Sequence, residues 1–402
     1  MTLDLIDGFL ASQSEKPEAL GNDKVELIVD GVSFQHFTSI SITRSMTQMA
    51  GEFSFEVSQK FKENVVENFG IYMGAPCQVK VNDKKIIDGY IDEIPLGYSA
   101  SSYNISFDGR DKTADLVDCS VDFAEGKNSF KNQTAGKILE KLCDPFGINV
   151  QYHDVDASVE MNDSKNPMED FTVDVGSPVF DSISKLCKRY AVLPYSIGDG
   201  NLTIGKAGVG LAFDGLEGGV NILSATLGAS DRNRFKVYKT KNVMGESIFP
   251  ARLLKGEIED EGIDRYRTIV ITDDNLNTPD ACQARCAWEA RVRAGKSRKV
   301  DITVQGWAQS NDLPWPINAL VHIRDDYLGL DEDRLIVSVE NTVDSGSGSF
   351  SNLELVKPET FDQLKSTQRK VLKKGYFATQ LEKDIAKHRR ELPKYGLWVT
   401  RL

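Results

Sequence analysis

Hydrophobic and polar residues alternate with a period of two over the first quarter of the chain. Turn signals stand at Asp30-Gly31 and at Asn82-Asp83. Such alternation is typical of half-buried strands, and a short polar turn between two runs indicates a hairpin. The strands that it predicts are 25–29, 32–34, 40–43, 53–57, 78–81, 85–87 and 103–107. We expect residues 22–124 to form an antiparallel β-barrel domain, preceded by a polar, flexible N-terminal arm at 1–21.

The middle of the chain changes to a helical period. Apolar residues from Ala135 to Phe146 recur at spacings of three and four, and Asp144-Pro145 with Gly147 marks an end. A second helix is predicted over 178–191, with its proline near the N-terminus, where a missing N–H costs little. A predicted hairpin over 195–204 turns at Gly198-Asp199-Gly200. Residues 125–207 are therefore predicted to form a small α+β insert.

Period-two patterning returns after about Gly215 and lasts to Val356. The clearest predicted strands are 266–272, 300–304, 335–339 and 350–356. One helix interrupts them, with Thr278 as the N-cap, Pro279 as the first residue and Gly295 as the C-terminal stop. The expected fold class is mainly β with an α+β insert. Two antiparallel β-barrel-like domains, 22–124 and 208–356, flank the small α+β domain, and a basic C-terminal tail follows at 357–402.

Charge narrows the functional classes. The 402 residues carry a formal net charge of −12, and residues 357–402 hold 12 Lys and Arg against 5 Asp and Glu. The tail is thus +7 and the rest of the chain −19. An acidic body argues against specific nucleic-acid binding, because affinity for phosphates comes mostly from Lys and Arg. The tail has two interpretations: a segment that docks on an acidic surface, or a solvated, partly helical terminus.

Other features exclude further classes. No apolar run approaches the roughly 18 residues of a membrane span, and the acidic N-terminus is unlike a signal peptide. Six scattered cysteines are too sparse for a disulfide scaffold and indicate reduced thiols in a cytosolic product. Dinucleotide, phosphate-loop, zinc-protease, nucleophile-elbow and EF-hand motifs are absent from the sequence. We therefore predict no catalytic, cofactor-binding or metal residue, and no cofactor.

Isolated histidines and a cysteine pair are the first residues to weigh as candidate ligands. The histidines are His36, His153, His322 and His388, each more typical of a structural or surface residue than of a ligand. Cys282 and Cys286 share one face of the predicted helix. Buried core thiols are favoured there over zinc, because no nearby Cys or His completes a set of ligands.

Carboxylates and tryptophans are the other candidates. Asp325-Asp326 and the pair Asp331 and Asp333 could form an acid/base pair or a weak cation site. In so acidic a chain, solvated turn residues are the alternative. The tryptophans have no period, which indicates core packing or an interface; they are Trp288, Trp307, Trp315 and Trp398.

Several segments together resemble Mu-like phage baseplate hub proteins, of the tail protein D or late control D superfamily. The similar segments are 108–120, 177–183, 198–204, 265–267, 287–295, 306–307, 315–318 and 335–339. Their order and spacing cover roughly residues 25–361. The tail beyond Phe361 has no counterpart in the resemblance.

The resemblance implies a structural protein of a contractile phage tail or a related injection device. Such hubs are homotrimers in which two related barrels per chain build a ring of six. The ring adapts the sixfold tail tube to the threefold central spike and lets DNA pass. The implied partners are the spike, the tail tube and other baseplate proteins, and the implied place is the virion, after assembly in the host cytoplasm. No catalytic residue is implied.

Two other functions stay open at this point. One is a tail-associated cell-wall hydrolase that uses a carboxylate pair, although residues 362–402 are too short to fold as a separate hydrolase domain. The other is a carbohydrate- or receptor-binding β module, which needs exposed aromatic side chains gathered on one face.

Overall fold

The first strand-rich block folds as an antiparallel sheet. The computed structural model describes residues 23–35, 37–59, 70–99, 103–122, 128–165, 167–244, 252–272, 278–344 and 348–363. The first unit consists of β3 (Ser39–Ser45), β4 (Glu52–Gln59), β5 (Pro76–Val81), β6 (Lys84–Glu93), β7 (Leu96–Tyr98) and β8 (Tyr103–Asp111). The hairpin of β1 (Val25–Val29) and β2 (Val32–Phe34) extends it beyond β5. Asp30 and Gly31 have positive φ, as the predicted turn requires.

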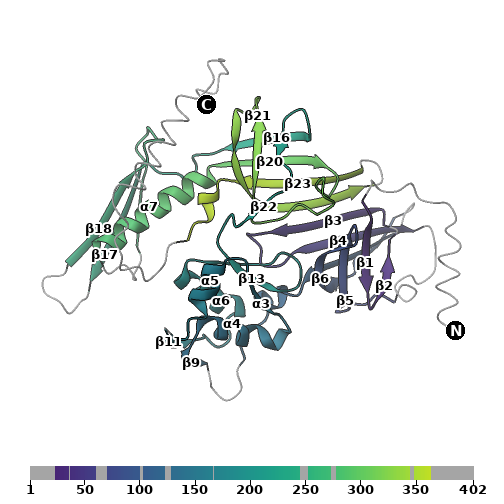
Figure 1. Cartoon of the computed structure of the whole chain (residues 1–402), viewed down its shortest axis with the longest axis horizontal. Helices are drawn as coiled ribbons and strands as arrows, with labels where there is room; N and C mark the ends of the chain where they lie inside the picture. Colours follow the sequence, from purple (N-terminus) through teal and green to yellow (C-terminus); the bar gives the residue numbers. More distant parts are fainter. Residues whose placement is uncertain are drawn as a thin grey trace.

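The second unit consists of β16 (Ile222–Ala229), β20 (Arg298–Gln305), β21 (Ala319–Asp325), β22 (Leu330–Asp344) and β23 (Gly348–Val356). The short strands β14 (Gly210–Leu211) and β15 (Leu216–Glu217) pair in parallel with β21. The two units join where β3 pairs with β22, so a single sheet runs through both (Figure 1). Among the described strands, its path begins at β16 and ends at β2. The predicted mainly-β class is confirmed.

The two units repeat the same topology. Numbered along the chain, the five main strands of each unit pair in the order first, second, fifth, fourth, third. Thus β3, β4, β5, β6 and β8 correspond to β16, β20, β21, β22 and β23. The repeat extends to buried positions, since Phe53 and Phe55 on β4 match Val300 and Ile302 on β20. Such alternation gives each unit a core on one face of its sheet.

The α+β insert lies against the junction of the two units (Figure 1). Its helices are α3 (Ala114–Asp118), α4 (Ala135–Cys143), α5 (Val155–Met161) and α6 (Val179–Tyr190), with a 3₁₀ turn η2 at Asp144–Phe146. Its strands are β9 (Ser129–Gln133), β10 (Val150–Tyr152), β11 (Met168–Thr172), β12 (Leu193–Tyr195) and β13 (Leu202–Gly205). The helices predicted at 135–146 and 178–191 are confirmed, and so is the hairpin of β12 and β13.

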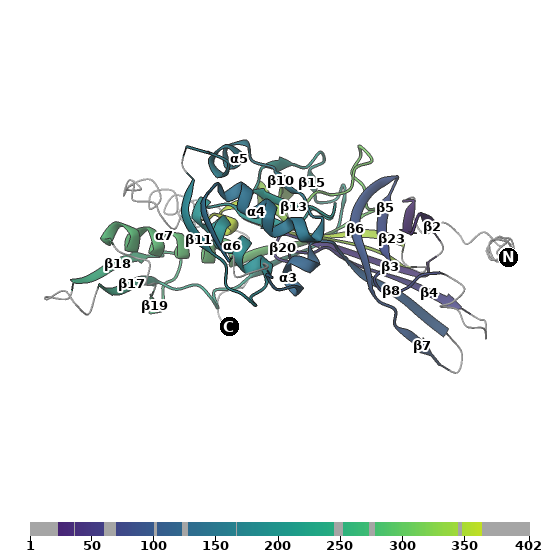
Figure 2. The same ribbon diagram turned by 90° about the horizontal axis from the view of Figure 1, so that it is seen from below.

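Residues between β16 and β20 form a lobe at one end of the molecule, which the sequence did not predict (Figures 1 and 2). Here α7 (Pro279–Lys296) packs on a sheet of β17 (Val237–Met244), β18 (Arg252–Glu259) and β19 (Thr268–Ile271). Thr278 caps α7 by accepting from the N–H of Ala281, as predicted. Gly295 as the helix stop was wrong, because α7 continues to Lys296. The glycine instead allows close approach of the 3₁₀ turn η3 (Pro358–Phe361), since a Cβ there would lie 2.3 Å from the Thr360 hydroxyl.

Within the described ranges, none of the helices has the length and apolar character that a membrane span requires.

Candidate functional site

The two histidines in the described part of the chain have local partners. His153 Nδ1 lies 3.1 Å from the Tyr195 hydroxyl. On β21, His322 is exposed and lies 2.9 Å from Asp333 and 3.2 Å from Asp331, and these carboxylates raise the pKa of His322. Tyr195 lies on β12 of the insert, and both aspartates lie on β22, which pairs with β21. Such local contacts are usual for structural residues. His36 and His388 lie outside the described residues.

Cys282 and Cys286 lie on the face of α7 that packs on β17. Both are fully buried, and the Cys286 thiol lies 3.7 Å from the Thr240 hydroxyl. Burial raises the pKa of Cys286, which favours the neutral thiol. Over the described ranges, no three His, Cys, Asp or Glu side chains come together as a metal site. That the pair binds no zinc stays a prediction.

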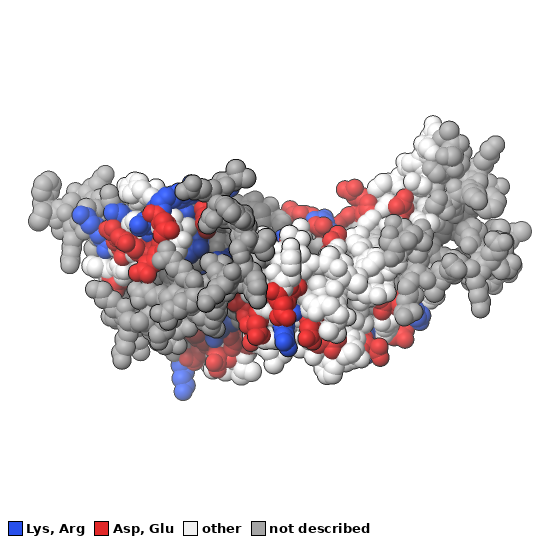
Figure 3. Space-filling view, turned by 90° about the horizontal axis from the view of Figure 1, so that it is seen from above, with Lys and Arg blue, Asp and Glu red and all other residues white. Residues whose placement is uncertain are grey.

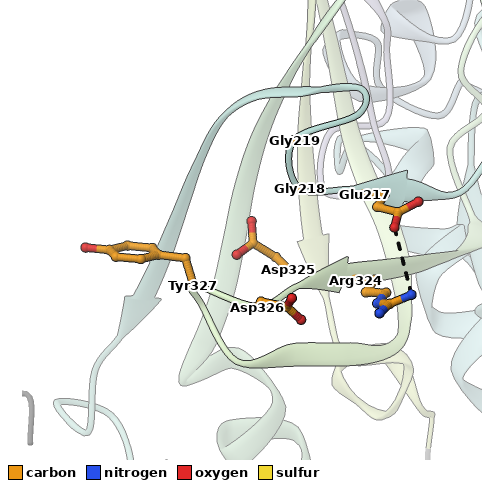
Figure 4. A pocket seen from close by; sticks show the side chains of 7 residues that line it. All are labelled: Glu217, Gly218, Gly219, Arg324, Asp325, Asp326 and Tyr327. Carbon is orange, nitrogen blue, oxygen red and sulfur yellow. Dashed lines mark ion pairs between the residues drawn. The ribbon is translucent and has the colours of Figure 1, made fainter. Parts of the chain in front are cut away.

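The carboxylates weighed as an acid/base pair lie in two places, at a surface cavity and beside His322. Asp325 and Asp326 line a cavity of about 320 Å³ at the turn after β21, shown in Figure 4. Asp325 accepts from the N–H of Leu328, and its neighbour Tyr327 points away into solvent. The cavity's one basic side chain, Arg324, lies 3.9 Å from Glu217. Asp331 and Asp333 contact His322 instead. Asp325 and Asp326 do not face each other across the cavity in Figure 4, as the paired carboxylates of a glycosidase would.

Two tryptophans belong to the sheet core. Trp307 is fully buried and donates from Nε1 to the carbonyl of Thr342, at 2.9 Å, while Trp315 is 3% exposed. Trp288 on α7 donates to the carbonyl of Asp362. Trp398 lies outside the described residues. Core packing therefore accounts for Trp307 and Trp315.

A buried carboxylate ties the insert to the first unit. Asp111, at the end of β8, is 0% exposed. Its Oδ2 accepts from Gly51 N–H and from the Ser196 hydroxyl, each at 2.8 Å, and its Oδ1 accepts from Thr113 N–H at 2.8 Å. Burial raises the pKa of Asp111 in spite of these donors. The network fixes three segments that are far apart in the sequence.

Two further contacts hold the framework together: one joins the insert to the sheet, and the other joins the two units. The predicted turn at 198–200 docks on β6, where Asp88 N–H donates to the Gly198 carbonyl at 2.8 Å. Gly198 has φ +93°, and a Cβ there would lie 2.0 Å from the Ile86 carbonyl oxygen, so only glycine fits. Arg44 on β3 donates to the Trp315 carbonyl at 2.8 Å, and burial lowers its pKa to about 10. The units and the insert thus form one framework for surface contacts.

The surface features that stand out are two strands at the borders of the sheet. On β7, Leu96 is 61% and Tyr98 85% exposed, and on β16 Leu223 is 54% exposed. Among the described strands, β7 pairs only with β8 and β16 only with β20. A strand with an open edge and exposed apolar side chains is a site for pairing with another chain. Neither strand was predicted from the sequence. Pro95 and Gly97 interrupt the pattern of β7, and β16 contains two alanines and a glycine.

Charge is unevenly spread over the surface. Figure 3 shows basic side chains gathered mainly at the end that carries α7, whereas acidic side chains are spread along the length of the molecule. On α7, Arg285 and Arg293 both pair with Glu289, at 2.8 and 2.9 Å.

Known proteins match this chain over most of its length. Three domain families match in order: "Mu phage baseplate assembly protein GpP-like, N-terminal" over residues 24–111, "Baseplate hub protein gp44-like, second domain" over 113–206, and "Mu phage baseplate assembly protein GpP, fourth domain" over 278–364. The baseplate hub protein gp44 of Escherichia phage Mu is 29% identical over 363 residues, which are 88% of this chain and 93% of that protein.

Solved structures agree with these matches. The 43 kDa tail protein of prophage MuSo2 from Shewanella oneidensis is 32% identical, with a TM-score of 0.74 over 84% of this chain and 99% of that one. The tail protein from Neisseria meningitidis MC58 is 19% identical and shares the fold, with a TM-score of 0.69 over 85% and 99% of the two chains. This chain belongs to the family of Mu-like phage baseplate hub proteins, and it is a structural hub protein of a phage tail.

Proposed function

We propose that three copies of this hub protein form a ring in a contractile tail, between a sixfold tail tube and a threefold central spike. The observation that carries the proposal is the internal repeat of the sheet. Each chain holds two units with the same strand order, so three chains present six similar units. A closed ring of three chains can therefore match sixfold symmetry on one side and threefold symmetry on the other.

The acidic body fits passage of DNA through the ring. Outside the basic tail the chain carries a net charge of −19. Negative charge around a channel repels phosphate, so the DNA has little affinity for the wall during ejection. We expect no specific nucleic-acid binding, and we expect assembly in the host cytoplasm before incorporation into the virion.

A purely structural role is favoured over the two alternatives. Within the described residues, Asp325 and Asp326 point in different directions, and Asp331 and Asp333 both contact His322. Of the aromatic side chains that the structure describes, the most exposed are Tyr98, Tyr266 and Tyr327, and they lie on three different parts of the fold. We therefore expect neither hydrolysis of peptidoglycan nor a carbohydrate-binding face.

Light scattering during size-exclusion chromatography tests the proposal. The expected mass is three times the chain mass of 44.6 kDa in the free protein, or that mass plus the mass of the spike after co-expression. A mass of one chain in both samples would overturn the trimer. Turnover of peptidoglycan that a single Asp or Glu substitution abolishes would favour the hydrolase instead.

A further inference from the structure

The junction between the two units is a template for a junction between copies. Within the chain, β3 pairs antiparallel with the C-terminal half of β22, with Ile42 opposite Asn341 and Ser41 opposite Thr342. Thus the first strand of the first unit joins the fourth strand of the second unit. Because the units repeat, the first strand of the second unit, β16, is available to make the same contact with the fourth strand of a first unit in another copy.

A shared β-bulge aligns the fourth strands. The pairing of β6 with β8 shifts between Ile91 and Glu93, and that of β22 with β23 shifts between Ile336 and Ser338. Glu93 therefore matches Ser338. Three residues further along each strand, Leu96 corresponds to Asn341, and the next residue, Gly97, corresponds to Thr342. The short strand β7 is thus the counterpart of the part of β22 that receives β3.

The first strands align through their partners. Ile42 on β3 faces Phe53, and Leu227 on β16 faces Val300, which is the counterpart of Phe53. Leu227 therefore corresponds to Ile42, and Thr226 corresponds to Ser41. Transferring the template pairs places Leu227 of one copy opposite Leu96 of the next, and Thr226 opposite Gly97.

The backbone hydrogen bonds agree with this register. In the template, Met46 N–H donates to the Val337 carbonyl at 2.8 Å, which puts Ile42 and Asn341 in a hydrogen-bonded row. On β16, Ser230 N–H donates to the Ser297 carbonyl at 2.9 Å, so the even-numbered residues face β20 and Leu227 faces outward. Ile42 in β3 and its counterpart Leu227 in β16 therefore both direct their backbone N–H and C=O groups to the junction.

Strand β7 meets the same requirement. Ser106 N–H donates to the Pro95 carbonyl at 3.1 Å, so Pro95 belongs to the row that faces β8 and the N–H of Leu96 faces outward. The N–H that proline lacks is thus not needed at the outer edge. Pro95 is therefore compatible with pairing of another strand along the outer edge of β7.

Burial at the template indicates what pairing would cover. Ile42, Asn341 and Val343 are at most 3% exposed at the internal junction. Their counterpart Leu96 is 61% exposed, and Leu227 is half-buried. Removal of this apolar surface from water provides a driving force for association.

We propose that β16 of one copy pairs antiparallel with the outer edge of β7 of the next copy, so that the sheet continues from chain to chain. The inference rests on the proposed trimer and adds the surfaces and the register. The contact is head-to-tail, with different strands on the two sides. Repeated around a threefold axis, it closes a ring and leaves neither strand exposed. Strand β7 lies at the tip of the first unit (Figure 2), and β16 at the opposite border of the sheet (Figure 1).

A pair of cysteines tests the register. Gly97→Cys and Thr226→Cys are combined in one chain that also carries Cys119→Ser, since Cys119 is the partly exposed native thiol. Gly97 has open space where the new Cβ would lie. The pair falls in the non-hydrogen-bonded row, where Cα atoms are about 4.5 Å apart, within disulfide reach. Mild oxidation is expected to give covalent dimers and trimers and nothing larger.

The matched control moves one cysteine by two residues. Gly97→Cys with Gly228→Cys places the thiols diagonally, about 7–8 Å apart, so its cross-linking is expected to be on the order of tenfold lower. Light scattering is run on the same samples. A trimer in which the control pair cross-links as well as the designed pair, or in which neither does, would overturn the register and leave the trimer intact. A monomer, with and without the spike, would overturn both proposals.

A second variant does not depend on oxidation. Leu96→Lys is expected to weaken self-association by about tenfold or more, which corresponds to about 1.4 kcal/mol. Tyr266→Lys is the control, because this side chain is 88% exposed and precedes β19 on the α7 lobe. Equal self-association of the two variants would count against the β7 surface.

Discussion

Asp111 is the clearest case of a single residue that holds distant segments together. Its buried carboxylate accepts from Gly51, Thr113 and Ser196, which lie just before β4, just before α3 and just after β12. Burial penalises the charged form, and the pKa of Asp111 is raised as a result. Sequence reasoning had no means to single out this aspartate among 60 acidic residues, because its partners meet only in the fold.

Replacing Asp111 by alanine should destabilise the protein strongly. The substitution leaves at least three buried donors without an acceptor, so we expect a loss of about 3 kcal/mol in the free energy of unfolding. Asp301→Ala is the control, because that side chain is 52% exposed on β20 and a loss of only about 0.5 kcal/mol or less is expected. Urea denaturation measures both. Equal losses in the two variants would show that the hydrogen bonds of Asp111 do not stabilise the fold more than an exposed side chain does.

The raised pKa of Asp111 also predicts a pH dependence. The folded carboxyl binds its proton more tightly than the unfolded one, whose pKa is about 3.9. Its contribution to the free energy of unfolding is therefore full below that value and is lost as the pH rises through the folded pKa. Asp111→Asn cannot titrate. The wild-type free energy of unfolding minus that of the variant should thus fall with rising pH above about 4. A difference that rises would contradict the assignment.

At the scale of elements, sequence patterns predicted those segments whose local signals agree with their packing. Helix α4 follows a strict apolar period and is capped by Thr134, and α6 ends at Ala191 in the left-handed region. Strands β17 and β18 were missed because they carry many charged residues and their apolar side chains are few; their sheet is covered by α7. Here tertiary contact outweighs local pattern. The domain boundaries near residues 124, 207 and 356 stay predictions.

The close approach of α7 and η3 predicts an unusual sign for a glycine substitution. In an open helix, Gly→Ala stabilises by about 1 kcal/mol. Gly295→Ala should instead destabilise by about 1–3 kcal/mol, because the new Cβ would lie 2.3 Å from the Thr360 hydroxyl oxygen. Adding Thr360→Ala removes that oxygen and should recover part of the loss in thermal denaturation. A stabilised Gly295→Ala variant would mean that η3 is displaced at little cost.

At the scale of the whole molecule, the fold is two repeats joined edge to edge. The repeat was not visible in the sequence, because matched core positions keep apolar character but not identity, as Phe55 and Ile302 illustrate. The connections differ too. Residues 46–51 connect β3 to β4, whereas the corresponding connection from β16 to β20 spans residues 230–297 and includes the α7 lobe. The hub family was predicted from short motifs and is confirmed by the comparisons. The surfaces that we propose between copies, on β7 and β16, could not be predicted from the sequence, because they depend on which strands pair and in which register.

The basic tail should be separable from the body, but only beyond its first residues. Asp362 accepts from Trp288 and pairs with Arg291 at 3.3 Å, and Phe361 packs near Leu335. A chain that ends at Gln363 should keep the melting temperature within about 2 °C, whereas one that ends at Lys357 should lose about 4 °C or more. Equal melting temperatures would show that these contacts add nothing.

The role of the tail in assembly stays a prediction, since residues 364–402 lie outside the described residues. We expect the chain that ends at Gln363 to assemble tails less well, because the +7 charge of the region after Val356 would favour docking on acidic surfaces. The intact protein should then assemble less well as salt rises. Normal yields of infectious tails from the shortened chain would mean that the tail is dispensable.

Averaged electron micrographs of the assembled hub test the central claim most directly. The account predicts a threefold ring with a central hole, whose wall is built from six similar units, two from each chain. A hub that is present in the tail as a single copy, or as a ring without threefold symmetry, would contradict it.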